Sequence, residues 1–203
     1  EVCLENGVNV DFFLEIINAH HNREYQPKNY LQSFSVILII DYLKKTHESY
    51  RKIKIPEIEL LIKELFESCR IQKQNLLLVK KFFDEYKTEF IAHITKENER
   101  IYPFALSIEK AYKSHKADNK LLQQIEKYSI NDFAAEHDDL EEKLFDLKSI
   151  IIKYLPPPKN SNLCNTILFK LFELETDLNN HTNIENKVLV PKVAAMENQL
   201  LSM

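Results

Sequence analysis

The segment His93–Pro103, HITKENERIYP, is written a second time as His181–Pro191, HTNIENKVLVP. Each copy holds a histidine, a Glu-Asn pair that begins four residues later, an aliphatic residue and a closing proline, and the copies start 88 positions apart (181 − 93). Positions i and i+4 of a helix share one face, so each copy predicts an imidazole and a carboxylate that point the same way. Such pairs can begin a metal site. The two predicted pairs are His93 with Glu97 and His181 with Glu185.

The composition predicts a helical protein. The 203 residues include a single glycine, Gly7, which argues against a fold built from strands and tight turns. Apolar residues recur at spacings of three and four over long windows, as they do in amphipathic helices. A chain of this length can bury one sizeable core. We predict an all-α fold, an antiparallel up-and-down four-helix bundle preceded by a short helical N-terminal segment.

Prolines and polar clusters mark where the helices are expected to begin and end. A short helical piece over residues 1–22 and a linker over 22–28 precede the bundle. The four long helices are expected over 31–68 with a bend at Pro56, over 72–115 with Pro103 inside, from about 130 to before Pro156, and over 162–201. The predicted domains are therefore residues 1–28 and the bundle, 29–203.

Charge, cysteines and hydropathy exclude several classes of protein. The net charge of −4 comes from interspersed charges of both signs, which is not the footprint of a nucleic-acid-binding surface. Cys3, Cys69 and Cys164 are odd in number and form no CxxC motif, which fits a reducing cytoplasm. The most apolar run, 36–40, ends at Asp41, far short of the ~20 residues that a membrane span needs. We expect a cytoplasmic protein, and the sequence leaves its oligomeric state open.

Four histidines recur at a nearly constant interval, one in each expected long helix. Their separations are 46, 44 and 44 residues (93 − 47, 137 − 93 and 181 − 137). A helix of an up-and-down bundle must present its ligand at the same height as its neighbours, and a constant interval satisfies that requirement. Six inward-facing metal ligands are therefore predicted: His47, His93, Glu97, His137, His181 and Glu185.

Four imidazoles and two carboxylates suit iron, manganese or zinc better than the all-oxygen sites of magnesium and calcium. Two carboxylates can each bridge a pair of ions, and two imidazoles then serve each ion. The remaining positions are open to a bridging oxo or hydroxo group and to a small molecule such as dioxygen or nitric oxide. Glu89, one turn before His93, and Glu136, beside His137, are candidate partners that hold these ligands from outside. For both, a solvated face is the competing interpretation.

The sequence resembles the hemerythrin-like (HHE) cation-binding bundles and, among them, the di-iron RIC, ScdA or YtfE type that repairs iron centres. Four motifs over about residues 31–200 carry the resemblance: Thr46-His47-Glu48, His93-x-x-x-Glu97 through Pro103, Glu136-His137-Asp138, and His181-x-x-x-Glu185-Asn186 through Pro191. The segment Cys3–Val10 resembles the end of a small ScdA-type N-terminal domain. In RIC proteins the matching four histidines and two glutamates hold a non-haem di-iron centre.

The resemblance implies a protein that binds two iron ions and helps to restore iron-sulfur clusters damaged by nitric oxide or oxidative stress. Its partners would then be nitric oxide, dioxygen and damaged iron-sulfur proteins. An alternative of another class is a di-iron sensory domain attached to a helix-turn-helix output domain, as in some bacterial relatives. A third interpretation is a metal-free helical interaction protein, which leaves inward-facing carboxylates without an account. A lone histidine on an apolar stripe is usually a core residue; the registered set of four favours a metal.

Overall fold

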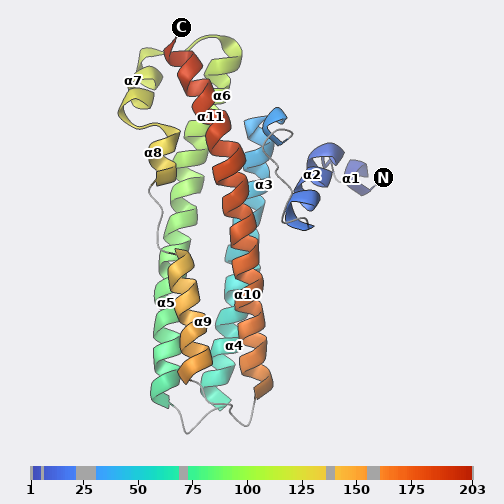
Figure 1. The fold of residues 1–203 in the computed structure, drawn as a ribbon, viewed down its shortest axis with the longest axis vertical. Helices are drawn as coiled ribbons and strands as arrows, with labels where there is room; N and C mark the ends of the chain where they lie inside the picture. Colours follow the sequence, from blue (N-terminus) through green and yellow to red (C-terminus); the bar gives the residue numbers. More distant parts are fainter. Residues whose placement is uncertain are drawn as a thin grey trace. The chain divides into compact units, whose positions relative to one another are not determined.

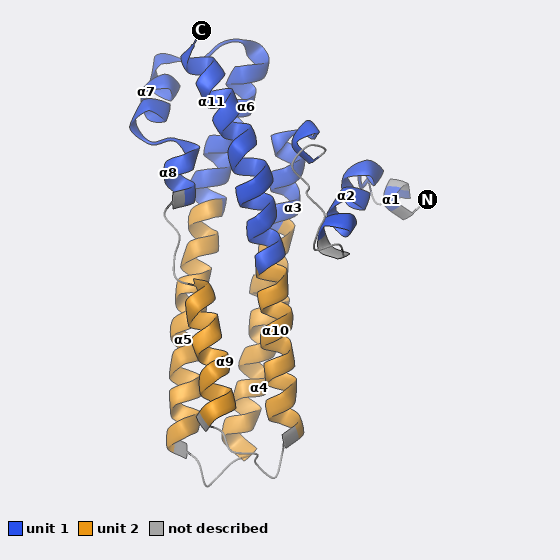
Figure 2. Cartoon of the chain, viewed as in Figure 1, with its two compact units in different colours: residues 1–44, 98–136, 179–203 blue, residues 45–97, 137–178 orange. Residues whose placement is uncertain are grey.

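The computed structural model describes residues 2–5, 7–21, 31–68, 73–135, 140–154 and 161–202. All regular secondary structure among these residues is helical (Figure 1), which confirms the predicted all-α class. None of the described helices combines the length and the hydropathy needed to cross a membrane. The chain forms two compact units, one of residues 45–97 and 137–178 and one of residues 1–44, 98–136 and 179–203 (Figure 2). The predicted linker, 22–28, lies outside the described residues, and the domain boundary at residue 28 stays a prediction.

The unit of residues 45–97 and 137–178 is a bundle of long helices. It contains α4 (Ile55–Ser68), α5 (Lys73–Lys96), α9 (Leu140–Tyr154) and the first three quarters of α10 (Ser161–Ile184). The segments 69–72 and 155–160 connect successive helices and are too short to return to the other end of a helix, so the joined helices run antiparallel. Apolar side chains three or four residues apart on each helix form one core, including Val79, Phe83, Tyr86, Leu144, Leu147, Ile167 and Leu171.

The other unit is built around α11 (Val190–Leu201), which packs on α6 (Tyr102–Ser114), α7 (Asn119–Lys127) and α8 (Ile130–Ala135). It also contains α1 (Val2–Glu5), α2 (Val10–His21), η1 (Leu31–Ser33) and most of α3 (Val36–Ser49). Within it, the Phe12 ring of α2 lies edge-on to the Phe34 and Tyr42 rings, at 5.2 and 6.1 Å between centroids. The predicted N-terminal helical piece therefore contributes to a core.

Two buried glutamates in this unit bind the first backbone amides of other helices. Glu109 Oε1 accepts a hydrogen bond from Val36 N, at the start of α3, over 2.8 Å and also pairs with Lys113 at 3.0 Å. Glu197 Oε1 accepts one from Ile130 N, at the start of α8, over 3.0 Å. The first amides of a helix have no partner inside it, so these carboxylates satisfy donors that burial would otherwise leave unpaired.

Three π-helical turns interrupt the described long helices, and each one precedes a proline. They are η2 (Tyr50–Lys54), η3 (Glu97–Ile101) and η4 (Glu185–Leu189), and each ends two residues before its proline, Pro56, Pro103 or Pro191. Ile55 N–H donates to Tyr50 O, and Val190 N–H to Glu185 O, five residues back in each case. A proline lacks an N–H and clashes with the carbonyl four residues earlier in an α-helix. The wider turn relieves that conflict, where the sequence predicted only a bend.

In η2 and η3 the extra residue of the turn also appears in the burial pattern. Tyr50 and Ile55 are buried with four accessible residues between them, and Glu97 and Tyr102 repeat that step of five. Within α4 and α5 buried positions follow steps of three and four. Glu97 and Glu185, the two predicted carboxylate ligands, are each the first residue of a π-helical turn. Such turns are frequent at functional sites.

Candidate metal centre

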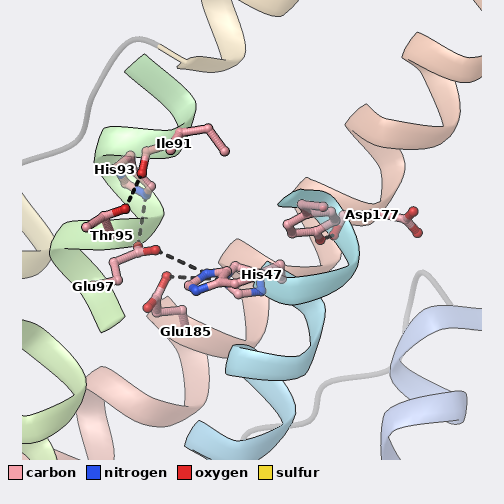
Figure 3. Close-up of polar contacts among 9 residues, drawn as sticks. His47, Ile91, His93, Thr95, Glu97, Asp177 and Glu185 are labelled. Atoms are coloured by element: carbon pink, nitrogen blue, oxygen red, sulfur yellow. Dashed lines mark hydrogen bonds and ion pairs between the residues drawn. The ribbon is translucent and has the colours of Figure 1, made fainter. Parts of the chain in front are cut away.

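In the unit of residues 45–97 and 137–178, the Glu97 carboxylate lies against two imidazoles (Figure 3). His47 Nε2 is 3.2 Å from Glu97 Oε2, and His93 Nε2 is 2.9 Å from Glu97 Oε1. His47 is near the end of α3, His93 is near the end of α5, and Glu97 begins η3. The four-residue step from His93 to Glu97 brings those two side chains to one face, as the sequence predicted, and the packing adds His47.

The chemistry of these atoms calls for a positive charge between them. A carboxylate oxygen and an unprotonated imidazole nitrogen both carry lone pairs, so their close approach is favourable only with a proton or a metal cation between them. Burial alone would raise the pKa of Glu97, but its interactions with the imidazoles of His47 and His93 outweigh burial and hold the pKa well below its usual range. Glu97 is therefore an ionised, buried carboxylate that faces nitrogen donors.

One oxygen of the Glu97 carboxylate is a buried acceptor that can still bind a proton donor or a cation. Glu97 Oε2 is buried and accepts no well-oriented hydrogen bond from the described part of the chain, although His47 Nε2 lies 3.2 Å away. A buried acceptor that is not satisfied costs free energy. A cation held by this oxygen and the neighbouring imidazole nitrogen would recover that cost, so the residues present fit a metal.

The second copy of the motif repeats the pairing. His181 Nε2, near the end of α10, lies 3.8 Å from Glu185 Oε2, the first residue of η4. His181 is buried and Glu185 is largely so.

Exposure distinguishes the members of the site. The Glu97 side chain is 5% exposed, whereas the His93 side chain is 26% exposed. Within this group His93 is therefore the more exposed member and Glu97 the more deeply buried one.

Three further residues were predicted to belong to the site, and the structure shows none of them there. His137 and Glu136 lie outside the described residues. Glu89 is exposed and forms an ion pair with Lys143 of α9. The assignment of these three residues to the site stays a prediction.

Sequence reasoning missed a set of contacts one turn beyond His47. Tyr50 Oη donates a hydrogen bond to the backbone carbonyl of Asp177 over 3.1 Å, and the Asp177 carboxylate pairs with Lys54. The available signal was that Asp177 precedes His181 by four residues and so shares its helix face. These contacts attach η2 to α10 within the unit of residues 45–97 and 137–178.

The fold and the site together define a class of protein. Long helices form a bundle, and on those helices the imidazole of His47 and the carboxylate of Glu97 are buried next to one another. Nitrogen and oxygen donors in that mixture suit a transition-metal cation. The class is a helical cation-binding domain.

Residues 38–193 match the family described as the hemerythrin HHE cation binding domain. The match covers more than three quarters of the chain, and the chain belongs to this family. It is also similar to the iron-sulfur cluster repair protein ScdA of Staphylococcus haemolyticus (strain JCSC1435), at 21% identity over 198 residues, which are 95% of this chain and 82% of that protein. No solved structure matches it.

Proposed function

We propose that this chain is a non-haem di-iron protein that acts in the repair of iron-sulfur clusters damaged by nitric oxide or oxidative stress. The observation that carries the proposal is the Glu97 side chain, buried against the imidazoles of His47 and His93. The family binds cations, and the similar ScdA protein is named for iron-sulfur cluster repair. Together these support an iron site used for repair.

The ligands of the proposed centre are the six that the sequence predicted. The repeat of the His-x-x-x-Glu pair supports a two-ion site in which each copy supplies an imidazole and a bridging carboxylate. Iron bound there would supply redox chemistry and open positions for nitric oxide or dioxygen. Manganese and zinc suit the same donors. The ligands are His47, His93, Glu97, His137, His181 and Glu185.

The chain's own residues favour a site that releases its cargo. Glu97 and His47 exclude water from one side of the site because both are buried. His93 is partly exposed, so a competing ligand from solvent or from a damaged iron-sulfur protein can approach the donor atoms there. We propose that iron enters and leaves past His93 and that repair takes place in the cytoplasm, where cysteine thiols stay reduced.

Metal content and repair of a damaged cluster test the two parts of the proposal separately. Protein from iron-supplemented cells should contain about two irons per chain, as a dinuclear site requires. Added to an iron-sulfur enzyme inactivated by nitric oxide, it should restore activity, whereas Glu97→Ala should restore none. Iron loading without restored enzyme activity would support the cation site and contradict the repair function. A chain that holds no iron would overturn both.

A further inference from the structure

The short helix η1 lies against the π-helical turn η4, which belongs to the second copy of the motif. Both are part of the unit built around α11. Leu31 of η1 is buried in the same core as Val188 and Leu189 of η4. The packing of these apolar side chains brings together two segments that are far apart in the sequence.

Gln32 of η1 forms hydrogen bonds on both sides of Pro191. Its side-chain Nε2 donates to the backbone carbonyl of Lys187, a residue of η4 that lies 155 positions later, over 3.3 Å. Its own backbone carbonyl accepts from Nζ of Lys192, near the start of α11, over 2.6 Å. One residue of η1 therefore holds both the wide turn and the helix that follows it.

The Lys187 carbonyl is the one whose usual donor is missing because of Pro191. In an α-helix the carbonyl of a residue accepts from the N–H four residues later, and a proline at that position has no N–H. In η4 the bonding runs five residues back instead, from Val190 N–H to Glu185 O. The side-chain amide of Gln32 brings a donor to the Lys187 carbonyl from outside the helix.

Loss of that donor is expected to move Glu185. Lys187 is exposed, so its carbonyl would tilt toward water. Glu185 lies two residues earlier in the same turn, and its Oε2 atom is 3.8 Å from Nε2 of His181. A metal site tolerates errors of only about 0.2 Å in the distances to its ligand atoms. A small tilt of η4 is therefore enough to impair His181 and Glu185 as a pair of metal ligands.

We propose that Gln32 is a positioning residue for the metal centre: its side-chain amide holds η4 at Lys187 and so keeps the Glu185 carboxylate beside His181. Gln32 does not touch the metal and acts only through the backbone of η4. The inference rests on the iron site proposed above, and it adds to that site a residue from an element that supplies no ligand.

Gln32→Leu removes the donor and keeps the approximate size of the side chain. Competition titration of the full chain against a coloured ferrous chelator should show iron affinity about tenfold lower or more, as for other residues that hold a metal ligand in place. Gln123→Leu, at an exposed glutamine of α7, is the matched control and should bind iron like the unaltered chain. Equal affinity in Gln32→Leu and the unaltered chain would overturn the positioning role alone. An unaltered chain that takes up no iron would overturn the iron site and the positioning role together.

Pro191→Ala tests the assigned hydrogen bond itself. The alanine returns an N–H four residues after Lys187, so the carbonyl no longer depends on Gln32. In the Pro191→Ala background, Gln32→Leu should weaken iron binding by less than about twofold, because the two changes act on the same carbonyl and are not additive. A loss as large as in the unaltered background would show that Gln32 acts by another route, which overturns the proposal.

Amide hydrogen exchange of the metal-free chain gives a readout that does not depend on iron. The Val190 amide, whose bond to Glu185 O belongs to the wide turn, should exchange at least about tenfold faster in Gln32→Leu, because the turn opens more often. The amide of Ile108, buried in α6, should keep its rate and shows that the variant is folded. Unchanged exchange at Val190 would overturn the hold of Gln32 on η4, whatever the iron affinity of the variant.

Discussion

At the residue scale, the chemistry of the site depends on a single side chain. Glu97 touches both His47 and His93, and its charge is the counterpart of any cation or proton that those imidazoles share. Glu109 is also a buried glutamate, but its oxygen is used by a backbone amide and by Lys113. Glu97 and Glu109 are similarly buried but have different partners. The Glu109 carboxylate binds the first amide of a helix, and the Glu97 carboxylate faces nitrogen donors.

Glu97→Gln should lower the affinity for iron at least about 100-fold, because the amide keeps the size of the side chain and loses the charge that a metal ligand needs. Elemental analysis after dialysis against a weak chelator measures the effect. Glu109→Gln is the matched control, since its amide oxygen can still accept from Val36 N, and it should keep full iron content. Equal iron in the two variants would contradict the assignment of Glu97 as a ligand.

Glu197 should make the stability of the protein depend on pH. Burial first, and then the nearby Asp132, raise the pKa of Glu197 from 4.5 to about 7, against the opposing hydrogen bond from Ile130 N. Between these two values the folded state holds a proton that the unfolded state has lost, so stability falls as pH rises through this window.

Thermal unfolding of the unaltered chain and of Glu197→Gln from pH 5 to pH 8 measures this dependence. The glutamine stays neutral and can still accept from Ile130 N, so the melting temperature of the variant should exceed that of the unaltered chain at pH 8 and match it at pH 5. If the melting temperatures of the two proteins changed with pH in parallel, Glu197 would be ionised at pH 8 without a loss of stability.

At the scale of elements, the π-helical turns allow a long helix to contain a proline and still keep its buried face continuous. A proline at position 56, 103 or 191 cannot follow an ordinary α-helical turn without a clash. The buried face must nevertheless continue on both sides of it, as Glu97 and Tyr102 do. One additional residue in a wide turn meets both demands, and the predicted ligands Glu97 and Glu185 stand at the start of two such turns.

Deletion of Glu99, an exposed residue of η3, should convert the turn to α-helix and keep the flanking buried faces in phase. The cost should be about 3 kcal/mol, because Pro103 then clashes with the preceding turn, and Pro103→Ala should recover most of it. Deletion of Glu85, an exposed residue inside α5, is the control and should prevent folding, since it rotates one buried face by about 100°. Chemical denaturation followed by circular dichroism compares them. A Glu99 deletion as damaging as the Glu85 deletion would contradict this account of the turn.

At the scale of the whole molecule, a cation that binds only the folded chain must stabilise it. At a free concentration one hundred times its dissociation constant, the gain is about 2.7 kcal/mol. For a chain of this size that corresponds to roughly 5–10 °C in melting temperature. The size of this stabilisation depends on how tightly the ligands bind the cation and not on the packing of the helices.

Removal of iron by a strong chelator should therefore lower the melting temperature by several degrees, and added ferrous iron should restore it. Differential scanning calorimetry on the same sample before and after chelation measures both steps. In Glu97→Gln neither treatment should move the transition. A shift of equal size in that variant would place the stabilising iron elsewhere on the chain.

Much of the fold could be predicted because it depends on local periodicity. The steps of three and four between apolar residues predicted the helices of both units, and the step of four between His93 and Glu97 predicted their shared face. The buried glutamates Glu109 and Glu197 could not be predicted. A charged residue within a helix is usually solvated, and only packing shows that its partner is the first amide of a distant helix.

The sequence by itself determined the helices and the two His-x-x-x-Glu pairs, because these depend on residues within one or two turns of each other, and four short motifs along the chain carried the family resemblance. Only the tertiary structure decided that His47 meets Glu97, fifty residues later (97 − 47), and that both are buried. It also decided the π-helical turns, since a step of five between Tyr50 and Ile55 is meaningful only once both are known to face the core. Burial is a property of packed helices, and a site made from two of them exists only after they pack.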